Sequence, residues 1–169
     1  MSGGRYISII HRIKVNFWTA TAFFLINALT ILAMPKIVEI SQETGKQLFL
    51  ILLGSIFWIS LLLGYVFVYL ANGDRKYFIM RRLDGDLSMG CHMGLITFFS
   101  NIPAVIVDSA MIASFIALFI IYYAGAINTY ITYVMLTILV FTLNMHCMFN
   151  GRIYRTTKYK RIRRENDYE

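Results

Sequence analysis

The chain has 169 residues, of which 58 % are hydrophobic and 15 % are charged. Soluble domains contain about 45–50 % apolar and about 25 % charged residues, so this composition excludes an ordinary soluble domain and a disordered chain. Two cysteines and two prolines exclude a disulfide scaffold and a proline-rich linker, and a net charge of +7 makes the placement of the cations informative. The sequence predicts an all-α integral membrane protein.

The first uncharged segment runs from Val15 to Pro35. A helix that crosses about 30 Å of hydrocarbon needs roughly 20 apolar residues, so residues 15–34 are predicted to form the first span. Pro35 is expected to end this helix and to open an external loop over residues 35–46. The apolar run is too long for a signal peptide and lacks a small-residue cleavage site, which indicates an uncleaved anchor.

Three further spans follow along the chain. Residues 48–70 are almost entirely Leu, Ile, Phe, Val and Tyr and are predicted to form the second span. The uncharged segment between Asp108 and Arg152 is too long for one helix, and Gly125 lies near its middle. This segment predicts a tight hairpin of spans 103–123 and 127–149. We therefore expect a four-helix transmembrane bundle within residues 1–150.

The orientation follows from the basic residues, which remain on the cytoplasmic side of spanning helices. With both termini in the cytoplasm, 14 of the 16 Lys and Arg residues are cytoplasmic, whereas the opposite topology leaves two there. We expect cytoplasmic termini and a multi-pass protein of the plasma (cytoplasmic) membrane. Both cysteines then face a reducing compartment, so no structural disulfide is expected.

The loop over residues 71–102 is the longest segment between spans. Its first part is predicted to continue the second helix into the headgroup layer, with long cations reaching upward. Asn101 and Pro103 are typical of an N-cap and a first helical turn, and they open the third span. The cations of this loop, for which we expect contact with lipid or a partner, are Arg75, Lys76, Arg81 and Arg82.

The tail over residues 151–169 is rich in cations interleaved with tyrosine. Such a cluster beside a span is typical of electrostatic attachment to anionic lipid, which we favour over nucleic-acid binding. The residues expected to bind lipid or a partner here are Lys158, Lys160, Arg161, Arg163 and Arg164.

One acid, Asp108, lies inside a predicted span, and an ionisable residue there needs a partner. If the last two spans fold back about residue 126, position 108 is level with position 144. The polar residues at that end are Asn144, His146 and Asn150. We predict an intramembrane pair of Asp108 and His146, with Asn144 and Asn150 as further hydrogen-bonding groups. The pair either fixes the hairpin or moves protons.

Other combinations of chemically reactive residues are less specific. Cys91-His92 and His146-Cys147 are two Cys/His pairs, but adjacent residues point about 100° apart on a helix, and zinc sites usually separate paired ligands by two to four residues. Asp84 and Asp86 flank a glycine and predict a turn rather than a cation site. Phosphate-binding loop, HExxH and GxSxG motifs do not occur, so we expect no catalytic residues, metal or cofactor.

The sequence favours a small non-catalytic accessory, assembly or regulatory subunit that presents the loop and the tail to a partner. We expect anionic lipid and either a protein partner or further copies of the chain as binding partners, and no nucleic acid. A small transporter or channel-forming subunit that uses Asp108 and His146 is the alternative. A peptidase that uses Cys91 with His92 or His146 is a third possibility.

Overall fold

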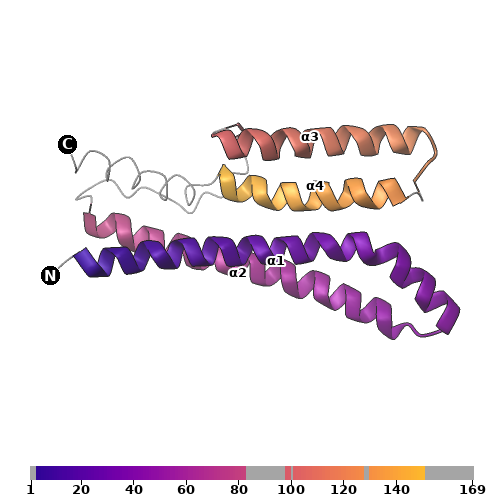
Figure 1. Ribbon diagram of the computed structural model, residues 1–169, viewed down its shortest axis with the longest axis horizontal. Coiled ribbons are helices and arrows are strands. Elements are labelled where there is room, and N and C mark those ends of the chain that lie inside the picture. The colour runs from indigo at the N-terminus through magenta and orange to yellow at the C-terminus, as the bar shows by residue number, and fades with distance from the viewer. Residues whose placement is uncertain (1–2, 83–97, 100, 128–129, 151–169) are drawn as a thin grey trace.

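The computed structural model describes residues 3–82, 98–99, 101–127 and 130–150, with side chains from residue 11 onward except over 72–82. Within these ranges the chain forms helices α1 to α4 and no strand (Figure 1). All four helices are long and apolar enough to cross a membrane. The chain is therefore all-helical, as predicted.

Helix α1 (Gly3–Thr44) continues through Pro35, so the external loop expected over residues 35–46 is helical as far as Thr44. Proline lacks an N–H group and its ring clashes with the carbonyl four residues earlier, which bends a helix without always ending it. The axis of α1 bends in this last part (Figure 1). Lys36 and Glu39 form an ion pair at 2.8 Å beyond the proline. Gly45, with φ +65°, then leads the chain into the next helix.

Helix α2 (Leu48–Arg82) runs back along α1 and extends well past its apolar part, as predicted for the start of the loop. The two helices approach closely at Gly64, where the ring of Phe24 occupies the space that a Cβ would need. The side chain of Asn27 donates a hydrogen bond of 2.8 Å to the carbonyl of Phe57 across the same interface. Small and amide residues thus hold α1 and α2 together, as they commonly do between spanning helices.

Helices α3 (Ile102–Tyr123) and α4 (Tyr130–Phe149) form the second hairpin. Asn101 is the N-cap of α3, because its side-chain oxygen accepts a hydrogen bond of 3.0 Å from the Ala104 N–H, and Pro103 lies in the first turn. Both assignments agree with the prediction. Gly125, with φ +70°, lies in the turn, as the sequence indicated.

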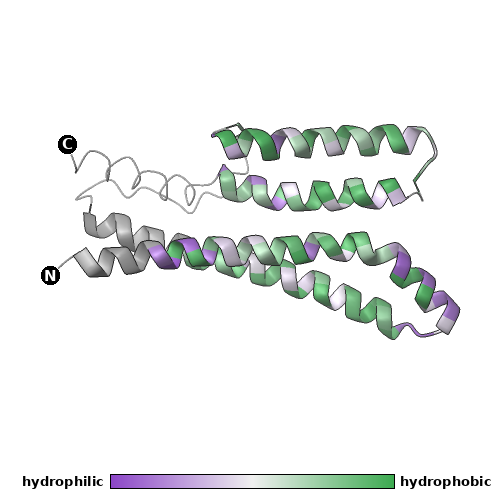
Figure 2. Ribbon diagram, in the orientation of Figure 1, coloured by the Kyte–Doolittle hydropathy of each residue, from purple (hydrophilic) through white to green (hydrophobic). Residues whose placement is uncertain are grey.

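The helices pack in the order α2, α1, α4, α3. Extensive contacts join α1 to α2 and to α4, and α4 to α3, whereas no comparable interface joins α2 to α3 within the described residues. Apolar residues cover the outer surfaces of the helices (Figure 2). The core gathers at the end of the molecule where α1 begins and α4 ends, around Ile13, Phe17, Val68, Ala71, Met145 and Met148.

Candidate functional site: a buried Asp–His–Asn cluster

The same end of the molecule holds a cluster of buried polar side chains. Asp108 lies in the second turn of α3, His146 in the last turn of α4, and Asn150 directly after α4. Asp108 is 0 % exposed and His146 is 2 % exposed. The Nδ1 atom of His146 lies 2.7 Å from Oδ1 of Asp108, so the structure brings the predicted pair into direct contact. Asp108, His146 and Asn150 are called the polar cluster below.

The carboxylate of Asp108 has further donors besides His146. The Asn150 amide nitrogen donates to both carboxylate oxygens, at 3.0 and 3.1 Å. The backbone N–H of Phe99 donates to Oδ2 at 2.6 Å. A buried carboxylate without partners costs several kcal/mol, whereas one that accepts several hydrogen bonds is tolerated.

The polar cluster holds the residues that lead into α3. Phe99 has φ +54°, a left-handed conformation that costs roughly 1–2 kcal/mol outside glycine. Its N–H reaches Asp108 from that conformation. The ring of Phe98 lies over His146, with ring centroids 4.6 Å apart. The amide nitrogen of Asn101 donates to the carbonyl of Phe149 at 2.7 Å. The entry to α3 and the end of α4 are thereby joined.

Asn144 lies outside this network, although the sequence grouped it with the pair. Its Oδ1 accepts a hydrogen bond of 2.8 Å from the hydroxyl of Tyr65 on α2, and its amide nitrogen donates to the Val140 carbonyl. Two positions on a helix separate Asn144 from His146 by about 200°, so the two side chains leave α4 on different faces. Asn144 therefore joins α4 to α2, and Asn150 takes the place at Asp108.

The remaining predicted site residues gather nowhere that the structure describes. Cys147 is a free, buried thiol beside His146. No group of three metal-ligating side chains occurs among the described residues. The backbone of α2 carries the four loop cations, whose side chains are outside the description. The following predicted residues and segments also lie outside the described part of the chain: Asp84, Asp86, Cys91, His92 and the basic tail.

A second buried amide lies apart from the polar cluster. Asn27 is 0 % exposed between α1 and α2, and its Oδ1 has no hydrogen-bond partner. Its neighbours Thr30 and Ser60 donate to helix carbonyls, those of Asn27 and Phe57. None of these bonds leads toward Asp108. No described hydrogen bond links Asn27, Thr30 or Ser60 to the Tyr65–Asn144 contact or to the polar cluster.

Two features of the site could not be found in the sequence. The Phe99 N–H is a backbone group, and every residue except proline has one, so no side-chain pattern singles it out. The Tyr65 hydroxyl lies on a helix where tyrosine is also expected as an interfacial residue. The Asn101 side chain, in contrast, was identified by its position before Pro103.

No family model, curated protein or solved structure matches the chain. Inferences about its function therefore rest on the polar cluster and on the packing of the helices.

Proposed function

We propose that the protein is a non-catalytic accessory, assembly or regulatory subunit of a membrane complex. In this proposal both termini and the loop over residues 71–102 lie in the cytoplasm, where loop and tail contact a partner. One observation carries the proposal: the polar cluster fastens the last residues of that loop to Asn150, the residue directly before the tail. The end of the loop and the start of the tail are thereby held to the same Asp108 side chain.

Three contacts of the last loop residues support this fastening. The Phe99 N–H donates to Asp108, Phe98 covers the ring of His146, and Asn101 binds the carbonyl of Phe149. Asn150, directly before the tail, donates to the same Asp108 side chain. The loop therefore cannot leave the bundle without breaking several hydrogen bonds together.

The closed form of the polar cluster favours this role over the alternative of transport. Asp108 is completely buried, and both oxygens of its side chain have hydrogen-bond partners. A pathway for ions or protons usually places polar groups at several depths. The other deep amide, Asn27, instead binds the backbone of α2.

Purification in mild detergent together with Asp108→Asn tests the proposal. We expect a second protein in stoichiometric amount with the wild type. The new amide keeps an acceptor for the Phe99 N–H, and His146 can accept through Nδ1 in one of its tautomers. Unfolding stability should therefore fall by only about 0.6–2 kcal/mol, and the partner should be retained.

Ser109→Ala is the matched control, because Ser109 is the exposed neighbour of Asp108 and its loss should change neither quantity. If Asp108→Asn keeps its stability but the complex loses its activity, the ionisable group of Asp108 is itself needed. That result would favour the alternative of a small transporter that uses Asp108 and His146. A chain that purifies only with copies of itself would contradict the accessory role.

A further inference from the structure

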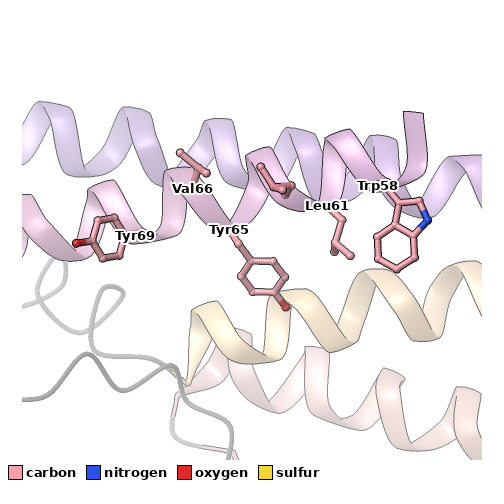
Figure 3. Close-up of a pocket in the computed structure, with 6 residues that line it drawn as sticks. Trp58, Leu61, Tyr65, Val66 and Tyr69 are labelled. Carbon is pink, nitrogen blue, oxygen red and sulfur yellow. The ribbon is translucent and has the colours of Figure 1, made fainter. Parts of the chain in front are cut away.

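One face of α2 carries a groove with a volume of about 520 Å³ (Figure 3). Each of its lining residues has another lining residue three or four positions further along or back in the sequence, which places them on a single helix face. From the first to the last is a distance of eleven residues, or about 17 Å along the axis. The lining residues are Trp58, Leu61, Leu62, Tyr65, Val66 and Tyr69.

This face is not the one that packs against α1. The residues of α2 that are buried against α1 are Ser60, Val68 and Ala71, whereas Leu62 and Tyr69 in the groove are 64 % and 70 % exposed. Tyr65 points toward α4, as Figure 3 shows, and its hydroxyl is bound to Asn144. The groove therefore lies beside α4. Among the described hydrogen bonds, the one from Tyr65 to Asn144 joins a lining residue of the groove to α4.

The shape and chemistry of the groove fit a hydrocarbon chain. Its lining is apolar apart from the Trp58 indole nitrogen and the hydroxyls of Tyr65 and Tyr69, and the Tyr65 hydroxyl already donates a hydrogen bond to Asn144. Its length of about 17 Å is close to one leaflet, which is half of the roughly 30 Å hydrocarbon core. An extended acyl chain is narrow enough to lie along this groove over its whole length.

Charges follow at one end of the groove. Helix α2 continues past Tyr69 to Arg82, and Arg75 and Lys76 come six and seven residues later, about 10 Å along the axis. The headgroup layer beyond the hydrocarbon is about 5–8 Å thick, so these two positions lie at its outer edge, within reach of lipid phosphates for residues as long as Lys and Arg. Asp74 is the one acid in the sequence over residues 72–82. The charge balance beyond the groove therefore favours an anionic headgroup.

We propose that this groove binds one acyl chain of an anionic phospholipid, whose phosphate lies within reach of Arg75 and Lys76. Tyr69, at the end of the groove nearest these cations, is then at the interface, where tyrosine is enriched in membrane proteins. The proposal rests on the proposed function in one respect, which is that the helices lie in a bilayer.

The two tryptophans of the chain provide a test with a built-in control. Trp58 lines the groove and Trp18 lies on α1, and both are 67 % exposed. Trp18→Phe leaves Trp58 as the one reporter, and Trp58→Phe leaves Trp18. Each full-length variant is reconstituted into vesicles of phosphatidylcholine and phosphatidylglycerol, in which one of the two lipids, at equal mole fraction, carries bromine along its acyl chains.

Brominated phosphatidylglycerol is expected to quench Trp58 several-fold more than brominated phosphatidylcholine, because each cation near an anionic surface favours binding by about fivefold. Trp18 lies four residues from Lys14, so any preference that it shows should be unchanged by Arg75→Gln with Lys76→Gln in the Trp58→Phe background. Arg75→Gln with Lys76→Gln, in the Trp18→Phe background, should remove the difference at Trp58.

Each other outcome overturns the inference. Equal quenching of Trp58 by the two lipids shows that the groove does not select anionic lipid. Quenching of Trp18 without quenching of Trp58 shows that a protein segment, from a partner or a second copy, covers the groove. Absence of quenching at both positions shows that the helices are not in the bilayer, which overturns the proposed function as well.

Discussion

Asp108 determines how the second hairpin can fold, because a buried carboxylate needs all of its partners at once. His146 and Asn150 come from the end of α4, and the Phe99 N–H comes from the residues that precede α3. A slip of one residue between α3 and α4 would remove the imidazole and the amide from the carboxylate together. The polar cluster therefore specifies the register of a hairpin whose other contacts are mostly apolar and less directional.

Gly64 is the residue at which α1 and α2 are most sensitive to added volume. In Gly64→Ala the new Cβ overlaps the ring of Phe24, which is itself fully buried and in edge contact with Tyr65. We expect this variant to unfold more easily, by about 1–3 kcal/mol, as in other overpacked cores. Thermal unfolding in detergent measures the change.

Gly54→Ala on the same helix is its control, since a Cβ there meets nothing within 4 Å. Alanine is the better helix former, so Gly54→Ala should be neutral or stabilise the protein by up to about 1 kcal/mol. Equal destabilisation by both substitutions would mean that the close approach at Phe24 has no special role.

At this scale the sequence predicts which side chains can meet but not where each one points. Folding the uncharged segment about residue 126 makes position 108 level with position 144, and His146 is within half a turn of it. Asn144 is equally level, yet it faces α2 and binds Tyr65. The difference depends on the rotation of α4 about its axis, which the packing of Met145 and Met148 against α1 determines.

Among the elements, α3 has an N-terminus that serves two purposes. The Asn101 side chain caps the helix through its oxygen and binds the Phe149 carbonyl through its nitrogen. The first bond stabilises α3 alone, and the second joins it to the end of α4. Both depend on the amide group, which has an acceptor and a donor in one side chain.

Two substitutions at Asn101 separate these purposes. Asn101→Ser keeps an oxygen for the Ala104 N–H but loses the donor, whereas Asn101→Ala loses both bonds. We expect a loss of unfolding stability of about 0.5–1 kcal/mol for serine and about 1.5–2.5 kcal/mol for alanine. Chemical or thermal unfolding in the same detergent compares them. If the two variants are equally stable, the cap contributes nothing measurable.

The extent of α1 shows the limit of sequence rules for elements. Pro35 followed by Lys36 predicts an end, because proline removes a hydrogen bond in a helix interior. The helix nevertheless reaches Thr44, with an ion pair between Lys36 and Glu39, and its axis bends in this last part (Figure 1). The apolar and polar pattern identified the helices themselves, but the balance of a few kcal/mol at one residue decides where such a helix stops.

For the molecule as a whole, the sequence predicts the side on which each end lies. The 14 to 2 distribution of basic residues favours both termini in the cytoplasm. A topology reporter fused after Gly125 should therefore indicate the external side, and the same reporter fused after Glu169 should indicate the cytoplasm. Signals from the same side in both fusions would contradict four spans.

The basic tail provides a second test on this scale. Replacing its cations by glutamine should weaken attachment of a tail peptide to anionic vesicles, and added salt should reduce the effect, because attraction decays within about 8–10 Å at physiological ionic strength. Vesicle co-sedimentation measures this binding. Equal binding to neutral and anionic vesicles would contradict it. The residues replaced are Lys158, Lys160, Arg161, Arg163 and Arg164.

The unequal lengths of the helices bear on which bilayer thickness suits the protein. Helix α4 has 20 residues and spans about 30 Å, whereas the candidate span of α1, His11–Thr44, has 34 residues, spans about 51 Å and carries charged residues near both ends. Because Phe17 contacts Phe149, α1 extends beyond α4 at both ends, by residues 11–16 at this end and by its last turns at the other. In these last turns α1 can meet the surface of a thinner or thicker bilayer at different residues. The shorter hairpin has no such reserve, so α3 and α4 set the hydrophobic mismatch that would sort this protein among membranes about 27–33 Å thick.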